Sequence, residues 1–171
     1  MTKKYDTRDP FELCDALGIL IHYQKMHKSV KAFYVYCLRV SNIVLNEGIS
    51  HDFQRVLVAH ELGHDREHRQ LLRLNRIRNV AFYDPADVCE TQANLFSAEL
   101  LIEDEEILDM IRCDYSLSHI AHELRLPIQL LDFKLRILEH KGFPVKAPRV
   151  AASNFLANDF EGCYEDFEHS W

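Results

Sequence analysis

The chain is poor in the residues that punctuate or cross-link a fold: its 171 residues include only 5 glycines, 5 prolines and 5 cysteines. The cysteines form no Cys-x-x-Cys pair and their number is odd. We therefore expect free thiols in a reducing compartment, the cytoplasm, and no disulfide framework. No apolar run approaches the roughly 20 residues that cross a bilayer. The polar N-terminal stretch MTKKYDTRDPFEL lacks the apolar segment of a secretory signal, so we expect no membrane association.

Positive charge is also scarce, because 20 Lys and Arg stand against 27 Asp and Glu and give a net charge of -7. Nonspecific DNA binding needs positive charge to displace counterions from phosphates, so direct DNA binding is not expected. A content of 47% hydrophobic and 27% charged residues is ordinary for a globular protein. It excludes a disordered, collagen-like or coiled-coil chain. The sequence leaves the oligomeric state open.

Local patterns predict an α+β fold with one helix and a small antiparallel sheet in the first third. Asp9 followed by Pro10 is typical of a helix start, and Gly18 of its end. Runs rich in β-branched and aromatic residues predict strands, and Ser-Asn suits a tight turn between two of them. The predicted strands are 19–23, 30–40 and 43–46, with the tight turn at 41–42.

The rest of the chain is predicted to be helical up to about residue 140. The expected helices cover approximately 50–70, 84–101, 103–111, 116–124 and 127–140. We expect three parts: residues 1–112 as the main domain, 113–143 as a helical extension resembling a helix-turn-helix, and 144–171 as a tail that becomes acidic and aromatic.

The chemistry is concentrated in the string His60-Glu61-Leu62-Gly63-His64. On a helix, residues four apart share a face, so two imidazoles can reach one metal ion with a carboxylate beside it. Apolar residues flank both histidines on the helix, where an unpartnered histidine would be costly. The alternative is that His60 and His64 are core histidines satisfied by their neighbours. Gly63 is unusual inside a helix and predicts the close approach of another backbone.

A zinc site of this type needs a third protein ligand and leaves one position open. His68 cannot supply it, because it lies about 12 Å along the helix axis from His60; we expect a structural or supporting role for His68. Glu90, on the next predicted helix, is the best candidate. Asn94, one turn further, would accept a hydrogen bond from the non-ligating N–H of a zinc histidine. The rival acids for the third position are Asp87 and Glu99.

Four segments in this order and spacing resemble the ImmA/IrrE metallopeptidases over about 100 residues. They are DPFELCDALGI (9–19), IVLNEGI (43–49), VAHELGHDREH (58–68) and ETQANLFSAELLI (90–102). The resemblance implies a small zincin-like, thermolysin-like fold, with zinc on His60, His64 and Glu90 and with Glu61 as the catalytic residue. Members of the family are bacterial and phage proteins, and several act on repressors of mobile elements or stress genes. Glu103 stands where the family often has proline, which affects the following loop.

The sequence therefore predicts a zinc-dependent endopeptidase that cleaves a regulatory protein such as a phage or mobile-element repressor. We expect the substrate to lie extended along strand 43–46. The alternative is a noncatalytic regulator that binds a repressor or DNA through residues 116–140, with zinc only structural. Segment 116–138 has a helix-turn-helix rhythm, but its charges balance, which favours two packed helices or a protein-docking surface over a DNA reader.

Overall fold

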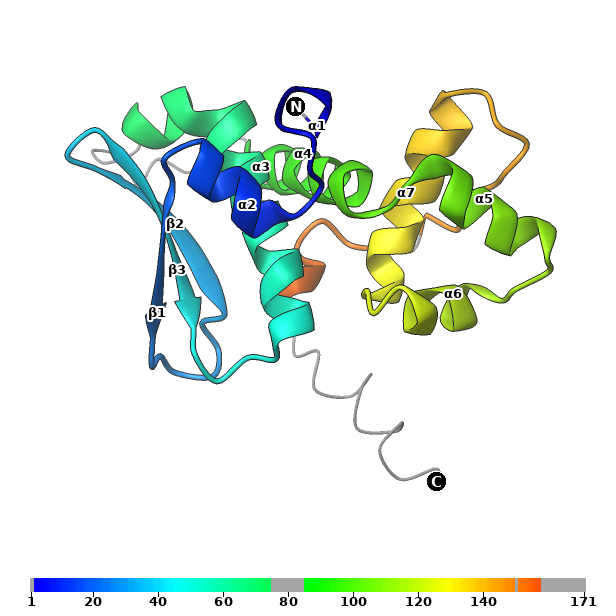
Figure 1. Cartoon of the computed structure of the whole chain (residues 1–171), viewed down its shortest axis with the longest axis horizontal. Coiled ribbons are helices and arrows are strands. Elements are labelled where there is room, and N and C mark those ends of the chain that lie inside the picture. The colour runs from blue at the N-terminus through cyan, green and yellow to red at the C-terminus, as the bar shows by residue number, and fades with distance from the viewer. Residues whose placement is uncertain (1, 75–84, 150, 158–171) are drawn as a thin grey trace.

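The computed structural model describes residues 2–74, 85–149 and 151–157 of the chain. The elements in chain order are α1 (Thr2–Tyr5), α2 (Pro10–Ala16), β1 (Leu20–Gln24), β2 (Ala32–Cys37), β3 (Val40–Asn46), α3 (His51–Leu74), α4 (Pro85–Leu101), α5 (Asp104–Arg112), α6 (Leu117–Glu123), α7 (Ile128–His140) and the 3-10 turn η1 (Phe155–Ala157). The sheet and the α5–α7 helices lie at opposite ends of the molecule, with α3 and α4 between them (Figure 1). Of the tail predicted at 144–171, residues 158–171 lie outside the described residues.

The helix predicted after Asp9 is α2, and it begins and ends as its sequence predicts. The Asp9 carboxylate accepts hydrogen bonds from the backbone N–H groups of Phe11 and Glu12 at 2.7 and 3.4 Å, with Pro10 at the first helical position. Gly18 leaves the helix at φ +67°, a left-handed conformation that costs glycine little. The chain therefore passes from the end of α2 directly into β1.

The sheet is mixed rather than antiparallel, which corrects the prediction. Its strand order is β1-β3-β2; β1 pairs parallel with β3, and β2 pairs antiparallel with β3. The fully buried side chains of Ile43 and Leu45 explain why β3 takes the centre, since a strand between two others removes most apolar surface from water. Asn46 secures the link between β1 and β2, because its amide donates to the Val30 carbonyl at 2.9 Å. The edge strands are thus β1 and β2.

The hairpin turn lies at Leu38 and Arg39, not at Ser41-Asn42 as predicted. Both turn residues have positive φ, 50° and 69°, which is the backbone of the two-residue turn whose twist matches the strands. Ser41 lies inside β3 instead, where its hydroxyl donates to Asp65 Oδ1 at 2.6 Å. A buried tertiary contact therefore outweighs the turn preference of Ser-Asn.

The five predicted helices after residue 50 are confirmed as α3 to α7, with ends shifted by a few residues. α3 packs on the sheet and α4 packs on α3 (Figure 1). The close approach expected at Gly63 is present, because a Cβ there would lie 3.0 Å from Ala93 Cα and 3.2 Å from Ala93 O. This contact brings the backbones of α3 and α4 together beside the two histidines.

Helix α7 is a core helix that packs against α4. Phe133, Leu130 and Leu138 are fully buried, and so is Lys134, whose ammonium lies 2.7 Å from Glu99 and 2.5 Å from Asp104. One hydrophobic cluster runs from α2 through α3 and α4 to α7. This burial favours the packed-helix interpretation of 116–140 over a helix that enters a DNA groove. The boundary between 1–112 and 113–143 stays a prediction.

Two further findings concern the cysteines and the helix lengths of the described residues. Three cysteines in these ranges are free thiols: Cys14, Cys89 and Cys113. Within the same ranges, no helix combines the length and the apolar character that crossing a lipid bilayer requires.

Candidate metal centre

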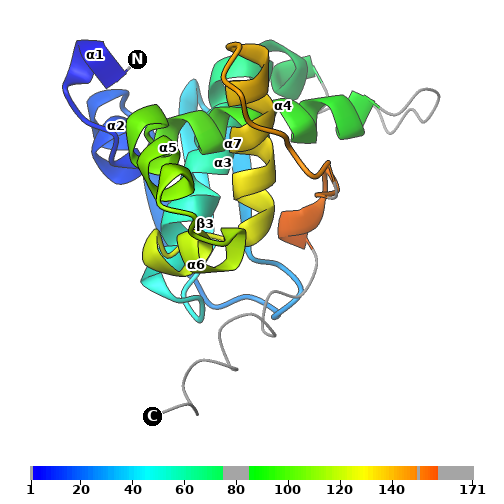
Figure 2. The same cartoon turned by 90° about the vertical axis from the view of Figure 1, so that its right-hand side faces the viewer.

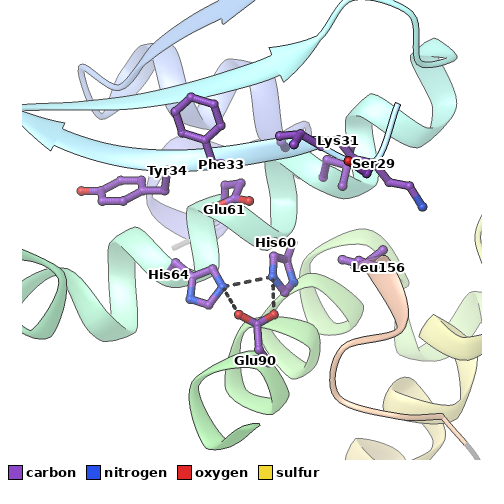
Figure 3. Close-up of a pocket in the computed structure, with 12 residues that line it drawn as sticks. Ser29, Lys31, Phe33, Tyr34, His60, Glu61, His64, Glu90 and Leu156 are labelled. Atoms are coloured by element: carbon purple, nitrogen blue, oxygen red, sulfur yellow. Dashed lines mark hydrogen bonds and ion pairs between the residues drawn. The ribbon is translucent and has the colours of Figure 1, made fainter. Parts of the chain in front are cut away.

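Helices α3 and α4 bring three metal-binding side chains to one point. His60 and His64 stand one turn apart on α3, and their Nε2 atoms lie 3.0 Å from each other. Glu90 approaches from α4, with one carboxylate oxygen 3.2 Å from His60 Nε2 and the other 3.3 Å from His64 Nε2. Figure 3 shows the three groups pointing toward one another below Glu61. The contact at Gly63 supplies the short distance between helices that this convergence needs.

The chemistry and spacing of these donors fit zinc. Bonds of about 2.0–2.1 Å at tetrahedral angles place donor atoms about 3.3–3.4 Å apart, close to the separations observed. Two imidazoles and one carboxylate form the donor set of many catalytic zinc sites, which keep a fourth position open. Among the described residues, this is the one cluster of three such groups, with all its donor atoms within 4.8 Å of one another.

The rings of both histidines are held on the side away from the shared point. His60 Nδ1 lies 2.9 Å from Asn94 Oδ1, and Asn94 is fully buried. His64 Nδ1 lies 3.3 Å from His68 Nδ1, and His68 Nε2 lies 2.8 Å from Gln92 Oε1. Asn94 and His68 therefore stand behind the two histidines, and His68 does not reach the shared point. Nothing in the sequence spacing pointed to Gln92.

The rival third ligands are placed differently from Glu90. Glu99 lies on α4 but turns to Lys134 and Lys141, each at 2.7 Å. The side chain of Asp87 lies outside the described part of the chain. Of the acids whose side chains are described, Glu90 is the one that meets the two histidines.

Glu61 lies between α3 and the edge strand β2. Its carboxylate is buried and accepts a hydrogen bond from the backbone N–H of Tyr34. A pocket opens at this place, and it is lined by residues 29–34 of β2 and the preceding loop, by Leu57, Glu61 and Leu156, and by the three donors. Glu61 thus stands on one wall of the pocket and the candidate metal ligands on another (Figure 3).

The charges in the pocket are strongly coupled. Burial raises the pKa of Glu61 above its ordinary value, although His60 and His64 oppose this shift. Burial alone would lower the pKa of His64, but its hydrogen bond to Glu90 and the nearby carboxylates raise it. Burial alone would raise the pKa of Glu90, but the hydrogen bonds and charge of the two histidines hold it well below its usual range. Glu90 is therefore the ionised member of the candidate ligand set, and Glu61 is the more basic carboxylate.

Asp65, the residue after the motif, was not singled out from the sequence. It is almost fully buried and accepts hydrogen bonds from Tyr34 Oη at 2.8 Å, Ser41 Oγ at 2.6 Å and Arg69 Nε at 3.0 Å. Burial would raise the pKa of Asp65, but these hydrogen bonds lower it. Asp65 therefore fixes β2 and β3 against α3 beside the metal centre.

A family model described as the IrrE N-terminal-like domain matches residues 14–136, which include His60, Glu61, His64 and Glu90. The chain belongs to the ImmA/IrrE metallopeptidase family. It is 31% identical over 143 residues to the metallopeptidase ImmA of Bacillus subtilis strain 168, covering 78% of each chain. It is 28% identical over 134 residues to a protein named immunity region protein 2 of Bacillus phage phi105, covering 78% of this chain and 84% of the relative.

Membership confirms the resemblance drawn from the four sequence segments. As an ImmA/IrrE metallopeptidase, the chain is expected to hold a metal, and the His60, His64 and Glu90 cluster is where the described residues can bind one.

Proposed function

We propose that this metallopeptidase is a zinc-dependent endopeptidase that hydrolyses a peptide bond in a regulatory protein, a phage or mobile-element repressor. The observation that carries the proposal is the convergence of His60, His64 and Glu90 beside Glu61 in one open pocket. The substrate class is supported by the names of the relatives, one an immunity region protein of a phage and the other the metallopeptidase ImmA.

His60, His64 and Glu90 would hold the zinc ion. When bound, zinc supplies Lewis acidity, which polarises a peptide carbonyl and makes water more acidic. Glu61 takes a proton from the attacking water as the water oxygen bonds to the carbonyl carbon. Glu61 then gives that proton to the amine nitrogen as the C–N bond breaks. The raised pKa of Glu61 makes its carboxylate a stronger proton acceptor for this task.

We propose β2 as the strand that a substrate pairs with, in place of the 43–46 expected from the sequence. Those residues belong to β3, whose two edges are already paired. The backbone N–H of Asn46 donates to the Lys31 carbonyl at 2.9 Å, so alternate residues from Lys31 face β3. Ala32 and Tyr34 between them turn their backbone groups to the other edge, where the Tyr34 N–H donates to Glu61. An extended peptide adding to this edge would pass over the candidate metal centre.

The alternative of a noncatalytic regulator with structural zinc has less support. A closed structural site needs four protein ligands, and the described residues converge as three. The helix that would read DNA or a partner, α7, buries seven of its residues, including Asp132 and Lys134.

The test is cleavage of candidate repressors encoded by the same replicon. The zinc-loaded full chain is incubated with each repressor, and the products are read by mass spectrometry for a defined cut site. Glu61→Gln is the matched control, because it keeps the zinc ligands and removes the proton acceptor. One cut site with the native chain and none with Glu61→Gln is expected. If neither the native chain nor Glu61→Gln cuts any of the repressors, the proposal is overturned.

A further inference from the structure

The chain beyond α7 turns back along that helix and is fixed there; we name residues 143–149 and 151–157 the return segment. The buried Asp132 of α7 accepts hydrogen bonds from the backbone N–H groups of Arg149 at 2.7 Å and Ala151 at 2.9 Å. Near its end, Phe155 stacks on Phe133 of α7 with ring centres 5.8 Å apart. Figure 2 shows the segment running beside α7.

This anchorage carries the return segment to the metal centre. The Asn94 amide nitrogen donates to the backbone carbonyl of Ser153 at 2.5 Å. The oxygen of the same amide lies 2.9 Å from His60 Nδ1. Leu156 lines the pocket and lies on the His60 side of it in Figure 3. One buried amide therefore joins the return segment to a candidate zinc ligand.

The two ends of an asparagine amide are not equivalent, because the oxygen accepts and the NH2 group donates. His60 can bind a metal through Nε2 only when its ring proton is on Nδ1, and that proton needs an acceptor. A flipped Asn94 amide would present NH2 to Nδ1 and favour the proton on Nε2, which blocks the ligand atom. The orientation of the amide thus decides whether His60 can be a ligand.

A backbone carbonyl can only accept a hydrogen bond. The Ser153 carbonyl therefore selects the Asn94 orientation in which the NH2 group faces Ser153 and the amide oxygen faces His60. We propose that the return segment is a positioning element of the metal centre: the Ser153 carbonyl orients Asn94, and Asn94 holds His60 in its metal-binding tautomer. The inference rests on the proposed metal centre and adds a part of the chain beyond the matched residues 14–136.

The first test measures the zinc dissociation constant of the full chain by competition with a chromophoric chelator. Asp132→Asn loosens the segment at a distance, because an amide oxygen can accept from one of the two backbone N–H groups while its NH2 faces the other. We expect zinc to bind about tenfold more weakly, the lower range for loss of a group that orients a ligand. Glu99→Gln is the control, since it weakens the Lys134 ion pair on the same α4–α7 interface without touching the return segment. It should leave zinc affinity within about twofold of the native value.

The second test separates orientation from general stability. Asn94→Asp places a carboxylate beside His60, and a carboxylate accepts whichever way it turns. It needs no orienting partner, but its second oxygen would face the Ser153 carbonyl acceptor to acceptor, so Asn94→Asp itself releases the return segment. Asn94→Asp should therefore bind zinc at most about threefold more weakly than the native chain, with or without Asp132→Asn. A purely structural role predicts that Asn94→Asp loses as much zinc affinity as Asp132→Asn does.

Phe155→Ala should also weaken zinc binding, because it removes the ring stacking that holds the far end of the return segment against Phe133. Folding of every variant is checked by its thermal transition before zinc is titrated. Equal losses of zinc affinity in Asn94→Asp and in Asp132→Asn, or native zinc affinity in folded Asp132→Asn and Phe155→Ala, would overturn the inference. Repressor cleavage plays no part in this readout. A chain that binds zinc with the predicted coupling but cuts no repressor would refute the proposed function alone.

Discussion

Lys134 of α7 is fully buried, and its ammonium lies 2.7 Å from the carboxylate of Glu99 on α4. Asp104 at the start of α5 contacts the same ammonium at 2.5 Å, and Lys141 reaches both acids from the surface. This cluster ties the C-terminal helices to α4, the helix that carries Glu90. A charge inside the core therefore connects α7 and the start of α5 to α4.

Replacing this buried lysine tests the connection. Lys134→Met keeps the apolar length of the side chain but leaves two acids with Lys141 as their partner. We expect a loss of about 1–3 kcal/mol in the free energy of unfolding, measured by urea titration. Lys141→Met is the control; because that side chain is partly exposed, it should cost about 0–1 kcal/mol. Equal costs for the two variants would contradict the assigned role of the buried charge.

Acid should loosen the return segment through Asp132. Burial alone would raise the pKa of Asp132, but the backbone N–H groups of Ala151 and Arg149 and the side chain of Arg136 lower it. A carboxyl with a lowered folded pKa stabilises the native state above its unfolded pKa, about 3.9 for Asp. That stabilisation is lost as the pH falls through the folded value.

The measurement for Asp132 is urea unfolding of the native chain and Asp132→Asn between pH 7 and about pH 2. The difference in unfolding free energy should be largest near neutral pH and should shrink below about pH 4. Asp109→Asn, which removes an exposed acid paired with Arg112, serves as the comparison and should show little difference at any pH. A constant difference across the whole range would contradict the prediction.

Zinc should stabilise the native chain through Glu90. A ligand that binds only the folded state at one hundred times its dissociation constant adds about 2.7 kcal/mol, so the melting temperature should rise with zinc and fall again with a chelator. Glu90→Gln should lose most of this response, because it replaces a charged ligand by a neutral amide. Glu105→Gln, at an exposed position in α5, should respond as the native chain does. A full zinc response in Glu90→Gln would remove Glu90 from the ligand set.

Position 63 should not tolerate even the single methyl group of alanine. Gly63→Ala would put a Cβ 3.0 Å from Ala93 Cα, a backbone atom that cannot move aside cheaply. The helices α3 and α4 must separate, at a cost of about 1–3 kcal/mol, and Glu90 should move away from the histidines, so zinc affinity should fall as well. Gly48→Ala, whose Cβ would meet only Asn46 Oδ1 at 3.6 Å, is the matched control. Unchanged zinc affinity in folded Gly63→Ala would show that the helix contact does not set the site.

The sequence by itself determined the local features of this protein. The cap at Asp9, the helices after residue 50, the pairing of His60 with His64 on one face and the close approach at Gly63 follow from spacings of a few residues. These features can be predicted from the sequence because helical geometry and capping depend on residues within one or two turns. The same spacing argument predicts that Glu90 and Asn94 lie on one face of a second helix.

Tertiary structure decided which distant segments meet. A period-two pattern is the same in parallel and antiparallel strands, so only packing placed β3 in the centre and moved the hairpin turn to Leu38 and Arg39. Packing likewise turned Glu99 to Lys134 and left Glu90 with the histidines. The contact of Asn94 with Ser153 joins positions 59 residues apart. No local pattern encodes that pairing, because a buried amide takes whichever partners the folded chain brings to it.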